Sequence, residues 1–166
     1  MLKLLYFIEF NIKDEFMIKI IYISDSSKHF QNAIDEYKKR FWKLVVLQQV
    51  KPSKKSSSNQ IIQEDTQNIN KILQKYKDNF NIMMSLSGKQ LDTMWFKDLI
   101  QENYDKWKNI NFIIWWAFGL DEDKLENINY KLNLSKLTFP HWLALLVLME
   151  QIYRSFQIIN WRNYHY

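Results

Sequence analysis

Residues 134–141 read Leu134-Ser135-Lys136-Leu137-Thr138-Phe139-Pro140-His141, and they join two elements that the surrounding pattern predicts. Before them, the short apolar stretch 130–134 is typical of a strand. After them, apolar residues recur at helical spacing over 140–156, which predicts the longest helix of the chain. Pro140 suits the first position of that helix, because its missing N–H would have no partner there. The octapeptide is therefore expected to be the loop of a strand–loop–helix unit.

Similar units precede this one along the chain. Apolar runs rich in Ile and Val predict four further strands, at 18–24, 44–50, 82–86 and 110–114. Segments with helical periodicity alternate with them, at 28–39, 61–76, 92–103 and 121–127. Such alternation predicts an α/β fold, a three-layer sandwich with a mainly parallel sheet. The run 110–114 is the most continuously apolar, so we expect it near the centre of the sheet.

Length and composition narrow the class of protein. The chain has 166 residues, of which 47% are hydrophobic, so one domain with a full core is expected. It has no cysteine, which excludes disulfides, thiol nucleophiles and thiolate metal sites. Lys3 and Glu9 interrupt the apolar start and no signal cleavage site follows, which predicts a cytoplasmic protein without a membrane segment. The net charge of +5 is compatible with a polyanionic partner.

Common signatures of nucleotide-binding and catalytic sites do not occur in the sequence. It contains no GxGxxG pattern, no phosphate-binding loop and no HExxH pattern, which disfavours an ordinary Rossmann or phosphate-loop enzyme. The three histidines are scattered, so they predict neither a Ser-His-Asp triad nor a metal site.

The C-terminal block resembles the RlmH family. The octapeptide 134–141 is similar to the family's LS-K-[ML]-TFPH pattern, residues 148–156 to its LLEQIYRAF pattern, and Tyr164-His165 to its terminal Tyr-His. Upstream, residues 36–41, 87–91 and 111–119 also resemble family segments. Because the resemblance begins at Met17, we expect a single domain over 17–166. Residues 1–16 are then an N-terminal extension or the result of a start site assigned too early.

The resemblance implies a fold, an activity and partners. RlmH proteins are SPOUT (α/β-knot) methyltransferases, so a C-terminal trefoil knot is implied. The implied cofactor is S-adenosylmethionine, and the implied methyl acceptor is N3 of a pseudouridine in the RNA of the large ribosomal subunit or assembled ribosome. The family also implies a homodimer whose second copy completes the active site, and the predicted helix 140–156 has an apolar face that suits such a contact.

The resemblance also implies which residues form the site. Three segments correspond to the family's cofactor loops: Met84 with the turn to Gly88, then Trp115 and Trp116, then Leu134, Ser135, Lys136, Leu137, Thr138 and Phe139. Each follows a predicted strand, where open parallel sheets bind ligands. Since the acceptor nitrogen must lose a proton, Arg154, Tyr164 and His165 are the catalytic candidates. His141 is a further candidate, but its place at a helix start favours a structural role, and Arg154 is spaced to pair with Glu150.

Two departures from the family pattern bear on this site. The family's acidic residue after Met84 is Ser85 here, and its two glycines are Trp115 and Trp116. Trp also occupies two other positions where the family favours glycine, 107 and 161. The chain has seven Trp and two Gly, whereas about a dozen Gly would be usual for this length. We therefore hypothesise that these Trp codons are UGA codons that the organism reads as glycine.

Genuine Trp residues leave other functions open. Aromatic rings stack on nucleic-acid bases and fill cores, so a Trp-rich protein is the alternative to recoding. Indoles at 115 and 116 would then fill the cofactor pocket, which predicts a non-catalytic module that binds RNA or the ribosome. A knot methyltransferase that acts on another RNA is a further alternative, because target choice depends on surface shape.

Overall fold

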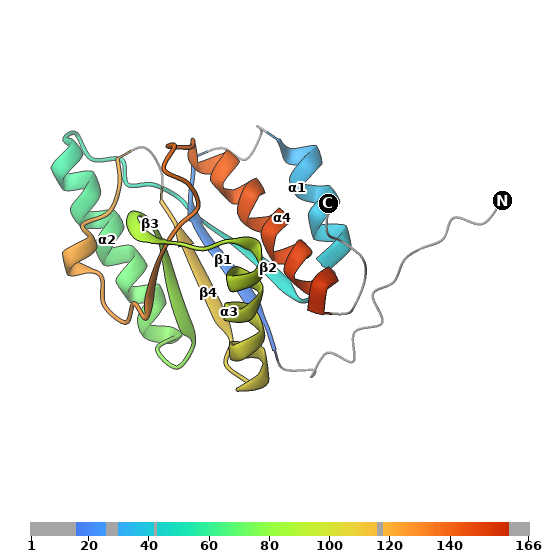
Figure 1. Cartoon of the computed structure of the whole chain (residues 1–166). Helices are drawn as coiled ribbons and strands as arrows, with labels where there is room; N and C mark the ends of the chain where they lie inside the picture. The colour runs from blue at the N-terminus through green and yellow to red at the C-terminus, as the bar shows by residue number, and fades with distance from the viewer. Residues whose placement is uncertain (1–15, 26–29, 42, 116–117, 160–166) are drawn as a thin grey trace.

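A computed structural model describes residues 16–25, 30–41, 43–115 and 118–159. Strands and helices alternate along this part of the chain (Figure 1). The strands are β1 (Ile18–Ile23), β2 (Val45–Val50), β3 (Phe80–Gln90), β4 (Ile110–Ile114) and β5 (Tyr130–Asn133). The helices are α1 (Gln31–Phe41), α2 (Ser58–Lys75), α3 (Thr93–Asp105) and α4 (His141–Ile159), with a short 3₁₀ turn, η1, at Glu122–Lys124.

The strands form one sheet in the order β2-β1-β4-β3-β5, and every pairing in it is parallel. β4 lies in the middle, as its continuous apolar run predicts, and all of its residues are buried. Because all strands are parallel, their carboxyl ends lie along one edge of the sheet. This edge receives the loops that follow β3, β4 and β5.

Helices cover both faces of the sheet. α1, α3 and α4 lie on one face, where α4 packs against both α1 and α3, and α2 lies on the opposite face (Figure 1). The larger core joins α1, α3 and α4 to the sheet through residues such as Phe112, Leu148 and Ile152. The smaller core joins α2 to the other face through Ile69 and Leu73. The predicted α/β three-layer sandwich is therefore confirmed.

Local signals explain where two of the helices begin. The Ser57 hydroxyl accepts a hydrogen bond from the backbone N–H of Gln60 at 3.3 Å at the start of α2. At the start of α3, the Asp92 carboxylate accepts one from the backbone N–H of Trp95 at 2.8 Å. Each cap satisfies a backbone donor that has no partner within the helix.

Two elements differ most from their sequence prediction, while the bounds of most of the others shift by one to three residues. The helix expected over 121–127 is only the turn η1, because Leu125 is extended and Asn127 adopts a left-handed φ of 58°. The third strand, expected at 82–86, continues to Gln90, because the chain returns to pair again with β5 after an interruption. That interruption shapes the candidate site.

Candidate functional site

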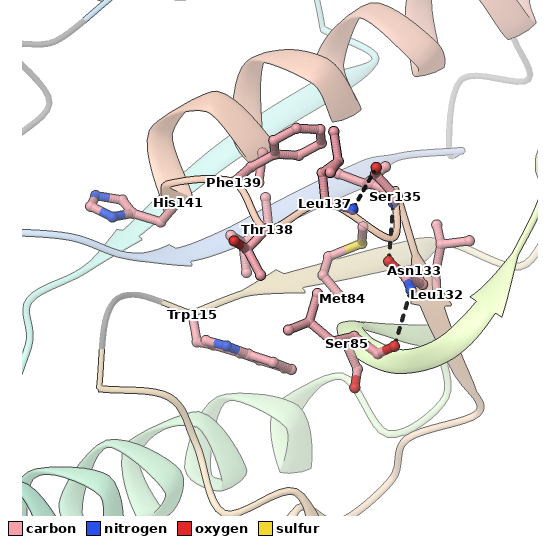
Figure 2. A pocket seen from close by; sticks show the side chains of 14 residues that line it. Met84, Ser85, Trp115, Leu132, Asn133, Ser135, Leu137, Thr138, Phe139 and His141 are labelled. Atoms are coloured by element: carbon pink, nitrogen blue, oxygen red, sulfur yellow. Dashed lines mark hydrogen bonds between the residues drawn. The ribbon is translucent and has the colours of Figure 1, made fainter.

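An open cavity of about 150 Å³ lies at the carboxyl ends of β4 and β5, beside the middle of β3 (Figure 2). The strands contribute mainly apolar residues to it, and the loop after β5 and the start of α4 contribute both apolar and polar residues. The lining residues are Met84, Ser85, Leu86, Ile114, Trp115, Leu132, Asn133, Leu134, Ser135, Leu137, Thr138, Phe139, His141 and Ala144. Concave pockets with apolar walls and a few convergent polar groups hold small organic ligands in other proteins.

The structure brings most of the predicted cofactor residues around this one cavity. Met84, Trp115, Leu134, Ser135, Leu137, Thr138 and Phe139 all line it. Lys136 is exposed and is not among the lining residues, and Trp116 lies outside the described residues. Sequence reasoning missed Ile114, Leu132, Asn133 and Ala144 as lining residues, whereas Leu86 lies inside the predicted segment from Met84 to Gly88. The only signal for the missed residues is their position beside the quoted segments, at the ends of predicted strands or, for Ala144, in the first turns of the predicted helix 140–156.

Part of the wall is a bulge in β3. The pairing of β3 with β5 passes from Met84 to Lys89, so residues 85–88 leave the ladder. We call residues 85–88 the β3 bulge. Gly88 is required in it, because a Cβ there would meet backbone atoms of Leu132 at 2.7 Å. Bulges of this kind re-aim side chains beside functional sites, and here the bulge directs Ser85 and Leu86 to the cavity.

Glu122 of η1 binds the β3 bulge. The Ser85 hydroxyl donates to Glu122 Oε1 at 2.6 Å, and the Ser87 hydroxyl donates to Oε2 at 3.3 Å. Lys131 of β5 forms an ion pair with Oε2 at 2.9 Å. Burial by itself would raise the pKa of Glu122, but the hydrogen bonds from Ser85 and Lys131 and the charge of Lys131 outweigh it and lower the pKa. The family's acidic residue after Met84 is Ser85 in this chain, but the Glu122 carboxylate, which comes from another segment, contacts that serine.

The loop after β5 is held by a chain of hydrogen bonds (Figure 2). Asn133 Nδ2 donates to the carbonyl oxygen of Leu86 at 3.0 Å, which ties this loop to the β3 bulge. Asn133 Oδ1 accepts from the backbone N–H of Ser135 at 3.0 Å. The Ser135 hydroxyl accepts from the backbone N–H of Leu137 at 3.0 Å. These side chains satisfy backbone donors locally, which fixes the loop's conformation on the polar side of the cavity.

His141 begins α4 at the edge of the cavity. Its Nε2 lies 3.1 Å from the hydroxyl oxygen of Ser24, a buried residue just after β1. Burial lowers the pKa of His141, and the negative charge of Asp25 opposes this only in part. The neutral imidazole is therefore favoured. This hydrogen bond supports the structural role that the helix start indicates, and the same residue also lines the cavity.

Trp115 lines the cavity without closing it. Its indole lies along one wall, below Met84 and to the left of Ser85 in Figure 2, and it also packs against the smaller core on the α2 side of the sheet. The cavity remains open beside the ring. The prediction that indoles at 115 and 116 would together fill the pocket stays a prediction, since Trp116 lies outside the described residues.

Of the three catalytic candidates, the structure describes only Arg154. Arg154 lies on α4, where its Nη2 and Nε donate to Glu150 Oε1 at 2.6 and 3.0 Å. It is not among the residues that line the cavity. Tyr164 and His165 lie outside the described residues. Within the described part of the chain, no three His, Asp or Glu side chains gather as metal ligands, and no helix is long and apolar enough to cross a membrane.

Comparison with known proteins agrees with this site. The family model described as "Predicted SPOUT methyltransferase" matches residues 16–165. Ribosomal RNA large subunit methyltransferase H of Clostridium botulinum (strain Kyoto / Type A2) is 40% identical over 146 residues, which cover 83% of this chain and 91% of the relative. The protein of the same name from Mycoplasmopsis pulmonis is 37% identical over 151 residues, covering 89% of this chain and 98% of the relative.

A relative with the same name from Caldicellulosiruptor bescii is 35% identical over 154 residues, and the match covers 90% of this chain and 99% of the relative. These matches extend over nearly the whole domain, including the strands and loops that surround the cavity. A C-terminal knot is a property that this kinship implies for the fold. The chain belongs to the SPOUT methyltransferases, and within them to the RlmH family.

Proposed function

We propose that this protein transfers a methyl group from S-adenosylmethionine to N3 of a pseudouridine in large-subunit ribosomal RNA. The observation that carries the proposal is the cavity at the carboxyl ends of β4 and β5, beside the β3 bulge, which the family's C-terminal loop completes. This edge is where open parallel sheets bind ligands. The relatives are named for methylation of large-subunit ribosomal RNA, which indicates the substrate class.

The residues around the cavity suit S-adenosylmethionine. An apolar floor of Met84, Ile114 and Leu132 can take the adenine ring, and the rim near Asn133 and Ser135 offers polar groups. The open space beside Trp115 also favours an enzyme over the non-catalytic module.

The chain's own residues bind, orient and exclude water. S-adenosylmethionine supplies an electrophilic methyl group when bound. Met84 and Leu132, both buried, exclude water from the floor. The hydrogen bonds through Asn133 and Ser135 hold the rim in one conformation, so little ordering is left to occur on binding. Methyl transfer is a displacement in which positioning supplies much of the rate.

We infer that Tyr164 and His165 act at the acceptor base, and that Arg154 aids by pairing with phosphate or with charge on the uracil ring. The terminal Tyr-His is the support for the first part, since packing rarely demands specific residues at a chain end. On α4 the Arg154 guanidinium pairs with Glu150, with Nη2 2.6 Å from Oε1. We further propose one domain over 17–166 that works as a cytoplasmic homodimer.

One experiment tests cofactor and substrate together. Calorimetry with S-adenosylmethionine measures binding, and mass spectrometry of digested RNA detects methylpseudouridine after incubation with unmodified large subunits, whole ribosomes, free ribosomal RNA or transfer RNA. Thr138→Trp places bulk in the cavity, so it should abolish both signals, whereas Lys77→Trp adds the same bulk on an exposed turn far from the cavity and should preserve them. Binding without methylation of any ribosomal substrate would favour another RNA.

A truncation tests whether the C-terminal tail acts in catalysis or in cofactor binding. A chain ending at residue 162 lacks Tyr164 and His165, and it should bind S-adenosylmethionine like the full chain while losing turnover. Undiminished turnover would remove the tail from catalysis. An equal loss of affinity and turnover would instead assign the tail to the cofactor.

A further inference from the structure

One wall of the cavity is held by side chains and not by the sheet. Ser85 and Leu86 line the cavity, and both belong to the β3 bulge. The β3–β5 ladder passes from Met84 to Lys89, so it does not determine the conformation of residues 85–88. Groups outside the ladder must therefore set the position of this wall.

Glu122 is such a group. Its two carboxylate oxygens accept the hydroxyls of Ser85 and Ser87, one each, and Lys131 binds the second oxygen at 2.9 Å. Ser85 also accepts from the backbone N–H of Ser87 at 3.1 Å. The Glu122 carboxylate thus binds both ends of the Ser85–Ser87 turn, and its ion pair with Lys131 connects them to β5. Hydrogen bonds to an ionised acceptor are about twice as strong as neutral ones.

The opposite side of the bulge is held independently. Asn133 Nδ2 donates to the Leu86 carbonyl oxygen, and the close approach of Gly88 to the Leu132 backbone fixes where the bulge ends. The Glu122 side chain is 27% exposed, and Glu122 is not among the residues that line the cavity. Its influence on a ligand must therefore pass through Ser85.

We propose that Glu122 is a positioning residue for the cofactor: its carboxylate holds the β3 bulge in the conformation that forms the Ser85–Leu86 wall of the cavity. The proposal rests on the cofactor site proposed above. It assigns Glu122 a role in shape and not in direct contact, because Ser85 stands between it and the cavity.

The test compares Glu122→Ala and Glu122→Gln with the parent chain and with a matched control. Gln keeps an oxygen that can accept the Ser85 hydroxyl but removes the charge, whereas Ala removes both. Asp123→Asn is the control, since Asp123 is an exposed acid on the same turn. Calorimetry measures affinity for S-adenosylmethionine and, separately, for S-adenosylhomocysteine, which lacks the positive charge. Hydrogen exchange of the backbone amides of residues 85–90 and thermal unfolding complete the set.

A loosened wall should weaken both ligands alike. We expect Glu122→Ala to lower affinity for each by about tenfold, Glu122→Gln to lower it less, and Asp123→Asn to leave it unchanged. In Glu122→Ala, exchange over 85–90 should accelerate while exchange in β1 and α4 and the unfolding temperature stay near those of the parent. A purely structural role would instead lower the unfolding temperature and accelerate exchange throughout.

Three results would overturn the proposal. Parent-like affinity in Glu122→Ala would show that the bulge needs no carboxylate. Unchanged exchange over 85–90 would show that Glu122 does not hold the bulge. Loss of S-adenosylmethionine binding alone, with S-adenosylhomocysteine binding kept, would indicate direct charge recognition. If the parent chain itself binds neither ligand, the proposed function fails first, so the two failures are distinguishable.

Discussion

Trp107 occupies a backbone position that normally takes glycine. It follows the end of α3 with a φ of 58°, and its side chain is 57% exposed. Its N–H donates to the Tyr104 carbonyl at 3.1 Å, and the N–H of Lys108 donates to the Asn103 carbonyl at 2.9 Å. This pair of bonds is a Schellman motif, whose left-handed residue is most often glycine.

Trp107→Gly should therefore stabilise the protein. Removing a Cβ from a left-handed residue should raise the free energy of unfolding by about 1 kcal/mol, measured by urea denaturation. Trp95→Gly is the matched control, because Trp95 is equally exposed (56%) but lies inside α3. There glycine should lower the free energy of unfolding by about 1 kcal/mol. Destabilisation at both positions would refute the strain at Trp107.

The glycine-codon hypothesis draws unequal support from individual residues. Trp107 supports it through its backbone conformation. Trp115 and Trp142 do not, since the first packs against the smaller core and the second stacks on Phe30 with ring centroids 4.4 Å apart. Trp42, Trp116 and Trp161 lie outside the described residues. The codons decide the matter: UGG at all seven positions would exclude recoding.

The two glycines present are constrained in different ways, and their substitution separates the two constraints. Gly88→Ala places a Cβ 2.7 Å from the Leu132 backbone, so β3 and β5 must separate and the cavity wall must move. Gly119→Ala meets open space but retains a φ of 80°, which should cost about 1 kcal/mol of stability. We expect Gly88→Ala to lose cofactor affinity in calorimetry and Gly119→Ala to keep it. Equal affinity in the two variants would contradict the role of the bulge.

At the scale of elements, one hydrogen bond joins the start of α4 to the end of β1. His141 and Ser24 are 117 residues apart in sequence, and their side chains meet at 3.1 Å. NMR titration should show a pKa for His141 below the usual 6.5, because burial favours the neutral ring. Its contribution to stability is then present above pH 6.5 and is lost as the pH falls through the folded-state pKa. A pKa above 6.5 would contradict the burial seen here.

At the amino ends of β3 and β4, a buried pair of asparagines contributes to the stability of the sheet. Asn111 Nδ2 donates to Asn81 Oδ1 at 2.7 Å, and Asn81 Nδ2 donates to the Asn127 carbonyl at 2.9 Å. Both asparagines are fully buried. Asn111→Ala leaves the Asn81 oxygen without its donor, so the free energy of unfolding should fall by about 2 kcal/mol in urea titration. Asn59→Ala, on the exposed start of α2, should change it by less than about 0.5 kcal/mol.

At the scale of the whole molecule, association should complete the site. The buried residues of α4 serve the core of the single chain, while Leu143, Leu146 and Val147 remain partly exposed. Sedimentation at micromolar concentration should give twice the chain mass of 20.4 kDa. Leu146→Arg should shift the protein to a monomer, whereas Val46→Arg, on the edge strand β2, should not. A monomeric parent chain would remove α4 from an interface.

Much of the fold could be predicted because its signals are local. The run 110–114 is apolar on both faces, and such a strand must lie inside a sheet that helices cover on both sides. Bounds were less predictable where a single residue changes the backbone, as at Leu125, whose extended conformation ends the expected helix after Lys124. The extension of β3 to Gln90 also escaped prediction, since it depends on pairing with β5 after the bulge.

By itself, the sequence determined the alternation of strands and helices, the family and the loops that surround the cavity, because periodicity and short motifs are properties of neighbouring residues. Only the tertiary structure decided which distant groups meet there. Glu122 reaches Ser85 across 37 residues, and His141 reaches Ser24 across 117. Neither contact has a local pattern, since each forms only when packed layers bring the segments together. The open space beside Trp115 depends on the same packing, which sets where the indole lies.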